Sequence, residues 1–252
     1  MNTSAPNALI FGAAGGIGAA LSRRLREKGW NLALASRDTS GALTALCEDI
    51  DATALRSDVT DLASVEAAFG AAQEKFGRID GVVNCVGSLL LKPAHLTSAD
   101  EWAHTIAANL TSSFNILRTA AGRMMRSGGG SIVLMSSAVA QRGMINHEAI
   151  AAAKAGVVGL AQSAAATYAR YNVRVNCVAP GLTRTPLTTT LTTNDASLKA
   201  STALHPLGRI GEPRDIASAI AWLLDPEQSW VTAQDLAVDG GLSSVQPRLA
   251  TA

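Results

Sequence analysis

The stretch ALIFGAAGGIG, residues 8–18, decides the fold of this chain. Its first four residues form a short apolar run typical of a buried strand, and an amphipathic helix is expected from residue 16 onward. Gly12, Gly16 and Gly18 leave the backbone amides at the start of that helix unobstructed by β-carbons. Such a helix N-terminus binds the pyrophosphate of a dinucleotide. A tight loop can have the same glycines, so the argument depends on the strand before them and the helix after them.

The rest of the chain repeats this alternation of strand and helix. Strands are expected at residues 8–11, 32–35, 54–56, 81–84, 132–135, 173–178 and 236–238, and helices at residues 16–28, 61–76, 101–126, 148–170 and 213–224. Parallel strands must be joined across a face of their sheet, so the pattern predicts a Rossmann-type, doubly wound α/β fold. We expect one domain over residues 1–252, with a lid-like insertion around residues 182–206 that is rich in threonine and serine.

Composition narrows the class of partner. The 252 residues include 21 basic and 20 acidic side chains, and no run of like charge indicates a nucleic-acid or membrane surface. No secretion signal is recognised at the N-terminus and no apolar run has the length of a membrane span, so we expect a cytoplasmic protein. Cys47, Cys85 and Cys177 are widely spaced, which favours neither disulfides nor a metal site. The expected partners are small molecules and further copies of the chain.

Further markers follow the glycine turn in a fixed order. They are Asp58 after the third strand, Asn84-Cys-Val-Gly87 after the fourth, Asn109 in a long helix, Ser136-Ser137 after the fifth strand, Lys154, Asn176-Cys-Val-Ala-Pro-Gly181 after the sixth strand and Val238-Asp-Gly-Gly241. Between residues 8 and 242 this series resembles the short-chain dehydrogenase/reductase superfamily. The ordered series is far more specific than any one of its members.

The resemblance implies a seven-stranded sheet in the order 3-2-1-4-5-6-7, with a nicotinamide cofactor along its carboxyl edge. Asn84 is expected to hold the sheet at the adenosine side, Lys154 the nicotinamide ribose and Thr185 the carboxamide, while Asp58 can accept from the adenine amino group. Phe11 and Ala233 stand where the family usually has threonine and glycine. The full set of expected cofactor-binding residues is Gly12, Gly16, Ile17, Gly18, Ser36, Arg37, Asp58, Val59, Asn84, Gly87, Lys154, Pro180, Gly181, Thr183 and Thr185.

The family's assembly gives a further expectation. The resemblance implies a homotetramer or homodimer that associates through the helices at residues 101–126 and 148–170. The second of these is rich in alanine and glycine. Its small side chains fit either a helix buried against the sheet or a face that also packs on a second subunit.

The catalytic set departs from the family pattern at one position. The resemblance implies a serine, a tyrosine and a lysine, and Ser137, Lys154 and the supporting Asn109 are present. Counting from either Ser137 or Lys154, the tyrosine position is occupied by Ile150, which has no proton to transfer. His147 is the first substitute, because its imidazole titrates near neutral pH and one helical face would hold it with Ile150 and Lys154.

Other proton paths remain open. Lys154 can act directly, or a water can be ordered by Ser137 and Lys154. Glu148 and His205 are weaker candidates, the first as an acid favoured by the helix dipole and the second as a lid residue. A solvated polar residue at the helix start is the alternative interpretation of His147.

The predicted function is an NAD(P)-dependent oxidoreductase acting on a carbonyl or a secondary alcohol. The alternative is a non-catalytic or regulatory dinucleotide-binding protein, and a purely structural oligomer explains the cofactor markers less well. NADP(H) is the preferred cofactor, since Ser36 replaces the usual carboxylate and Arg37 can pair with a 2′-phosphate. NAD(H) stays possible, because Asp38 follows directly.

Overall fold

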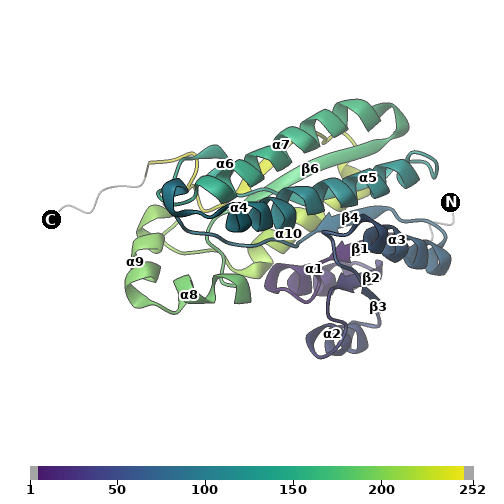
Figure 1. The fold of residues 1–252 in the computed structure, drawn as a ribbon. Coiled ribbons are helices and arrows are strands. Elements are labelled where there is room, and N and C mark those ends of the chain that lie inside the picture. Colours follow the sequence, from purple (N-terminus) through teal and green to yellow (C-terminus); the bar gives the residue numbers. More distant parts are fainter. Residues whose placement is uncertain (1–4, 247–252) are drawn as a thin grey trace.

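Seven parallel strands form one sheet in the computed structural model, which describes residues 5–246 (Figure 1). Their order is β3-β2-β1-β4-β5-β6-β7, as expected. The strands are β1 (Asn7–Phe11), β2 (Asn31–Ser36), β3 (Thr53–Arg56), β4 (Gly81–Asn84), β5 (Gly130–Met135), β6 (Val173–Pro180) and β7 (Asp235–Val238). The chain winds outward from β1 to β3 and then returns to pair β4 with β1, so a crevice opens at the carboxyl ends of these two central strands.

Ten α-helices lie within the described residues. They are α1 (Gly16–Glu27), α2 (Ala42–Ile50), α3 (Leu62–Phe76), α4 (Ala99–Ile106), α5 (Ser112–Met124), α6 (Ala138–Gln141), α7 (Glu148–Tyr168), α8 (Thr189–Thr192), α9 (Asp195–Leu204) and α10 (Pro213–Leu224). Helices α3, α5 and α7 cover one face of the sheet, and α1, α2 and α10 cover the other. Helix α2 was not expected from the sequence, whereas the bounds of α10 agree with the expectation.

The single helix expected at residues 101–126 is divided into three parts. A π-helical turn, Ala107–Thr111, separates α4 from α5. Asn109 lies in this turn with no exposed surface, and its side-chain amide donates to the carbonyl of Thr105 at 2.9 Å. The wider turn therefore places a polar side chain inside the protein, a use of π turns that is frequent at functional sites.

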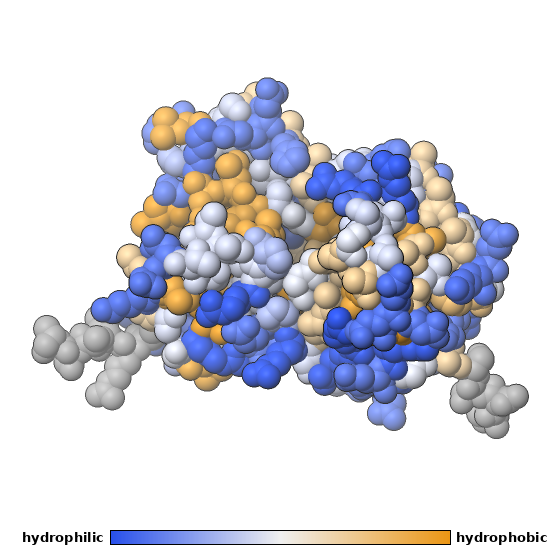
Figure 2. Space-filling model, turned by 90° about the horizontal axis from the view of Figure 1, so that it is seen from below, coloured by the Kyte–Doolittle hydropathy of each residue, from blue (hydrophilic) through white to orange (hydrophobic). Residues whose placement is uncertain are grey.

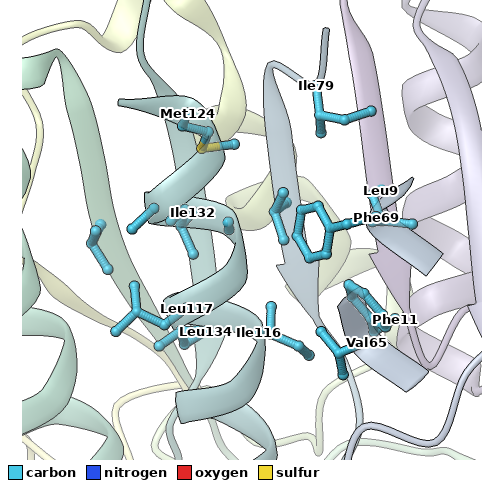
Figure 3. Packing of buried hydrophobic residues seen from close by; sticks show 14 of the residues in the cluster. Leu9, Phe11, Val65, Phe69, Ile79, Ile116, Leu117, Met124, Ile132 and Leu134 are labelled. Carbon is cyan, nitrogen blue, oxygen red and sulfur yellow. The ribbon is translucent and has the colours of Figure 1, made fainter. Parts of the chain in front are cut away.

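The core divides into two hydrophobic layers because successive strand residues point to opposite faces. On β1, Leu9 and Phe11 join the layer under α3 and α5, and Ile10 joins the layer under α1 and α10. Figure 3 shows Phe11 beside Phe69 of α3, with ring centroids 5.7 Å apart. Burying each such ring contributes about 2–3 kcal/mol, so phenylalanine is accommodated where the family usually has threonine.

Helix α7 and the turn after it, Glu148–Tyr171, are long and apolar enough by composition to span a membrane. Val157 and Ala161 of this helix belong to the buried layer against the sheet. Ala152, Ala155 and Gly159 face outward and are exposed. Packing on the sheet accounts for the apolar composition of the first face, and a contact of the second face with another subunit stays a prediction.

The segment from residue 182 to residue 206 leaves the carboxyl end of β6 and contains α8 and α9, which Figure 1 shows beyond the end of the sheet. His205 ties this segment back to β6. Its Nε2 accepts from the backbone N–H of Leu182 at 3.2 Å, so Nδ1 carries the proton and donates to the carbonyl of Ser201 at 2.7 Å. The imidazole is 3% exposed and holds both ends of the segment in place.

Candidate active site

The glycine turn meets the first helix in the geometry expected for an anion site. Gly12 has φ +75°, and a β-carbon there would lie 2.9 Å from the backbone of Val86. A β-carbon at Gly18 would lie 2.3 Å from the carbonyl oxygen of Gly12. Helix α1 begins at Gly16, and no side chain among residues 5–246 caps its first amides. Glycine is therefore required by close contacts here, and the free amides can bind phosphate oxygens.

A groove of about 410 Å³ runs from this turn along the carboxyl ends of β1 to β4. Ten of the expected cofactor-binding residues line it: Gly12, Gly16, Ile17, Gly18, Ser36, Arg37, Asp58, Val59, Gly87 and Thr185. Pro180 and Gly181 line a second cavity beside the groove, and Asn84, Thr183 and Lys154 are buried next to these two spaces. Residues separated by more than 160 positions in the sequence thus share one edge of the sheet.

Asp58 lines the groove in the loop after β3. Its Oδ1 accepts from the hydroxyl of Thr60 at 2.7 Å and from the Thr60 backbone N–H at 2.9 Å. These hydrogen bonds hold the pKa of the Asp58 carboxyl below its usual value. Asn115 of α5 supports the same loop from below by donating to the carbonyl of Val59 at 3.0 Å. Asn115 was not identified from the sequence, because a polar residue within a helix has no local pattern that indicates its partner.

Ser36 and Arg37 line the groove at the end of β2, whereas Asp38 is not among the described lining residues. The Asp38 carboxylate accepts instead from the hydroxyl and the backbone N–H of Ser40, at 2.7 and 2.8 Å. These bonds lower the pKa of Asp38. The Asp38 carboxylate is thus occupied by its own turn, and Arg37 is the charged residue at the end of β2 that lines the groove.

Asn84 and Asn109 order the loop after β4. Asn84 is 1% exposed, donates to the hydroxyl of Ser113 at 3.1 Å and accepts from the N–H of Val86 at 3.0 Å. Asn109 donates to the hydroxyl of Ser88 at 2.9 Å and accepts from its N–H at 3.2 Å. Both side chains are therefore engaged by protein groups, and their effect on a ligand passes through the loop they position.

Lys154 lies between the groove and the end of β5. It is 7% exposed, and its Nζ donates to the carbonyl of Met135 at 2.8 Å. A β-carbon at Gly87 would come within 3.6 Å of the same Nζ, which places the ammonium beside the groove lining. Burial lowers the pKa of Lys154 from 10.5 to about 8, because the charged form is poorly solvated there.

The second cavity, of about 640 Å³, contains the remaining candidate side chains. Ser137, His147, Ile150 and His205 all line it. Ser137 precedes α6 and accepts from the N–H of Val139 at 3.4 Å, which leaves its hydroxyl proton free to donate. Ile150 is 4% exposed. The expected set of serine, histidine and isoleucine is therefore brought together around one space.

His147 differs in one respect from the expectation. Helix α7 begins at Glu148, so His147 flanks the helix as its N-cap residue and does not lie within it. The helix does not begin earlier because Asn146 has φ +64°, a left-handed conformation that a right-handed α-helix cannot include. His147 still reaches the cavity, with Nδ1 at 2.6 Å from the carbonyl of Ile145. The carbonyl requires the proton on Nδ1, and within residues 5–246 Nε2 has no hydrogen-bond partner.

The weaker candidates lie differently. Glu148 is exposed and lines a separate, smaller cavity beside Trp102. His205 lines the main cavity, but both of its ring nitrogens already form hydrogen bonds within the chain. Tyr168 and Tyr171 lie at the far end of α7, next to the start of β6 and so at the opposite edge of the sheet. Among the titratable side chains expected to transfer a proton, His147 is the one with a free atom at this cavity.

Residues 182–206 were expected to form a lid over the site, but the helix within them that forms part of the cavity wall was not identified from the sequence. Helix α9 presents Ser197, Ala200, Ser201 and Leu204 to the cavity. Their spacing of three, four and seven residues is that of one helical face, a signal that the threonine-rich composition of the surrounding segment conceals.

Known proteins share this sequence pattern and fold. A family model described as Enoyl-(Acyl carrier protein) reductase matches residues 12–243. The 3-oxoacyl-[acyl-carrier-protein] reductase FabG of Vibrio cholerae is 36% identical over 249 residues, which cover 96% of this chain and 99% of that protein. A short-chain type dehydrogenase/reductase from Mycobacterium ulcerans has a TM-score of 0.91 at 29% identity, over 98% of this chain and 93% of that one. A variant of actinorhodin polyketide ketoreductase, solved with NADPH, has a TM-score of 0.90 at 28% identity, over 96% and 98% of the two chains.

Proposed function

The chain belongs to the short-chain dehydrogenase/reductase superfamily, and on that premise we propose that it transfers hydride between NADP(H) and a carbonyl or secondary alcohol. The observation that carries this proposal is the pair of adjoining spaces at the carboxyl edge of the sheet. The groove contains the glycine turn, the cavity beside it contains Ser137, and Lys154 lies next to the groove at the end of β5. A redox cofactor and a small substrate can meet there.

The groove residues fit a dinucleotide. The amides at Gly16 and Gly18 would hold the pyrophosphate, and the loop at Asp58 and Val59 would hold the adenine. Lys154 would hold the nicotinamide ribose, and Thr185 the carboxamide, with Pro180, Gly181 and Thr183 shaping that end. When bound, the nicotinamide supplies or accepts the hydride.

The preference for NADP(H) rests on the end of β2. Arg37 lines the groove, and Ser36 leaves room for a phosphate where a carboxylate would repel it. The hydrogen bonds between Asp38 and Ser40 keep the neighbouring carboxylate occupied. NAD(H) can still bind through all the other contacts, so the arginine determines a preference between the two cofactors.

The proton path would differ from that of the family, because Ile150 stands at the position of the tyrosine. Ser137 would donate a hydrogen bond from its hydroxyl group to the substrate oxygen and so polarise the carbonyl, while keeping its proton. His147 would exchange the proton through Nε2, as acceptor when an alcohol is oxidised and as imidazolium donor when a ketone is reduced. Lys154, acting directly or through an ordered water, is the alternative path, and burial brings its pKa to about 8, near the range that this work requires.

The test replaces the histidine by alanine and by glutamine. We expect both His147→Ala and His147→Gln to bind NADPH normally and to lose turnover by about 100-fold. We also expect both to lose the fall in rate that a general base causes at low pH in alcohol oxidation and that a general acid causes at high pH in ketone reduction. Near-normal turnover in both variants would assign the proton to lysine and water. Ile150→Tyr restores the family triad in sequence, and new activity on simple ketones would show that the isoleucine limits the chemistry.

A second candidate function is supported by the same geometry. Asn109 forms hydrogen bonds with Ser88 and Thr105, Lys154 donates to the backbone carbonyl of Met135, and Ile150 has no titratable atom. A regulatory dinucleotide-binding protein needs nothing more than this. Binding of NADPH without turnover of any alcohol or ketone in a broad panel favours that alternative.

The remaining expectations concern organisation. We propose one domain, with residues 182–206 as a lid over the substrate, and a homodimer or homotetramer that packs through α4, α5 and α7. The outward alanine and glycine residues of α7 support that face as the contact. The cytoplasmic location, and the expected lack of nucleic-acid and membrane partners, stay predictions.

A further inference from the structure

The walls of the second cavity consist of uncharged side chains. None of its lining residues, all of which lie in the described part of the chain, is a lysine, arginine, aspartate or glutamate. A cavity of about 640 Å³ in a chain with 41 charged side chains is rarely so free of them at random. The uncharged lining is therefore a feature of this cavity that bears on which substrates it can bind.

The apolar lining comes from segments far apart in the sequence. Leu89 and Leu91 follow β4, Val139 and Met144 follow β5, and Leu191 and Leu204 belong to the 182–206 segment. Figure 2 shows hydrophobic atoms gathered at the end of the molecule where Figure 1 places α8 and α9. Ile145, at the mouth of the cavity, is 86% exposed, so the apolar surface continues outward to solvent.

Within the ten residues of α9, charged side chains are likewise kept away from the cavity. Its charged side chains, Asp195 and Lys199, are exposed and do not line the cavity. The face with Ala200 and Leu204 lines it, together with the hydroxyl groups of Ser197 and Ser201. The helix is thus oriented so that only apolar atoms and hydroxyl groups meet a bound molecule.

Two cations, Lys92 and Arg142, lie close to this lining in sequence. The Lys92 ammonium forms an ion pair with Glu101 at 2.8 Å, and Arg142 is engaged by the backbone. Its guanidinium donates to the backbone carbonyl of Leu242, whose side chain lines the cavity. The hydrogen bonds of His205 are those of a neutral imidazole, and His147 lines the cavity together with Ser137. A carboxylate or phosphate bound along the α9 wall would lose water and gain no opposite charge, which is strongly unfavourable.

We propose that the substrate is an uncharged, largely apolar ketone or secondary alcohol, an inference that rests on the oxidoreductase function proposed above. Its carbonyl or hydroxyl group lies at Ser137, and its apolar body packs between the loop after β4 and the face of α9. The hydroxyl groups of Ser197 and Ser201 can serve one neutral polar substituent on that body. Free acids and phosphate esters are excluded by the cost of burying their charge.

The experiment compares three ketones that share one carbon skeleton. The methyl ester of 4-(3-oxobutyl)benzoic acid is neutral, the free acid is an anion at pH 7.5, and the corresponding primary amide controls for polarity without charge. We expect kcat/KM with NADPH to be at least about 100-fold higher for the ester than for the acid, with the amide between them. Binding of each compound to the protein–NADPH or protein–NADP⁺ complex is measured by calorimetry in parallel.

An engineered cation locates the effect. Leu204→Arg places a guanidinium on the α9 wall at a side chain that is 39% exposed, and we expect it to narrow the preference for the ester by about tenfold or more. Leu207→Arg is the matched control, because Leu207 is 74% exposed and lies outside this cavity. The control should keep the parent's ratio of ester to acid.

The outcomes separate this inference from the function on which it rests. Equal or better turnover of the acid overturns the substrate class while the oxidoreductase function stands. Preferential binding of the ester without turnover of any ketone supports the cavity's selectivity and counts against the redox function. If neither the ester nor the amide binds or reacts, the inference is overturned.

Discussion

The substitution Lys154→Met tests the energetic consequence of the buried ammonium. Methionine keeps most of the length and apolar volume of the lysine side chain, so the change removes the charge and little packing. Lys154 is 7% exposed and has one hydrogen bond, to the carbonyl of Met135. We therefore expect the variant to be more stable than the parent at neutral pH, although it loses that bond.

The magnitude follows from the depressed pKa. Burial lowers the pKa of Lys154 from 10.5 to about 8, and each pH unit corresponds to about 1.4 kcal/mol. The unfolded chain binds the proton more readily, so below pH 8 the buried charge reduces the free energy of unfolding by about 3 kcal/mol. The lost hydrogen bond offsets about 1 kcal/mol of the gain. The variant should be about 2 kcal/mol more stable at pH 7.

The difference in free energy of unfolding between the variant and the parent changes sign as the pH rises. Between pH 8 and 10.5 the folded parent releases the proton that the unfolded chain still holds, so the parent gains stability and the advantage of the variant shrinks. Above pH 10.5 the parent, which keeps its hydrogen bond, should be the more stable by about 1 kcal/mol.

The assay is urea denaturation without nucleotide, followed by circular dichroism at several pH values from 7 to 10.5 and at one protein concentration. Only the difference between parent and variant is interpreted, because other groups titrate equally in both. Lys199→Met, at an exposed position of α9, is the control and should leave the difference near zero at every pH. A difference for Lys154→Met that is independent of pH would refute the argument from burial of the charge.

Three further substitutions have distinct expected results. Arg37→Ala should weaken NADPH binding by about 10- to 100-fold and leave NADH binding nearly unchanged, measured by fluorescence titration; equal losses for both would remove the proposed 2′-phosphate contact. Ser137→Ala should reduce kcat by about 100-fold with an unchanged Kd for NADPH, and the reverse pattern would show that the roles are wrongly assigned. Ala233→Gly should raise the free energy of unfolding by about 1 kcal/mol, because Ala233 has φ +62°, a conformation that glycine adopts without strain; an unchanged Tm would contradict this.

The sheet could be predicted because its signals are local. The apolar runs of β1 and β4 are short and buried on both faces. The first is followed by a glycine and the second ends in an asparagine, and both features can be recognised in the sequence without the structure. Helix α2 was missed because it follows an irregular turn around Gly41 and buries only Leu43, Leu46 and Cys47. A π turn divides the long helix expected at residues 101–126. The turn places Asn109 inside the protein, and local helix propensity does not indicate that this polar side chain is buried.

The candidate site was predictable only in its membership. Which residues follow the carboxyl ends of parallel strands can be counted in the sequence, and Gly12, Asp58 and Ser137 were located in this way. Whether a side chain is free to act depends on its partners. His205 and His147 are both histidines near one cavity, yet hydrogen bonds occupy both nitrogens of the first and one nitrogen of the second.

The amino-acid sequence by itself determined the parallel sheet, the glycine turn that favours a dinucleotide and the isoleucine at position 150, because each depends on residues close together in the chain. Only the tertiary structure decided that Lys154 is buried beside Met135, that Asp38 is hydrogen-bonded to Ser40 and does not line the groove, and that α9 lines the cavity with an uncharged face. Burial and hydrogen bonding arise from contacts between segments that are distant in sequence. Local periodicity in the sequence does not indicate which distant segments come into contact. The burial of each side chain at the site, and therefore its pKa and its free hydrogen-bonding atoms, depends on those contacts.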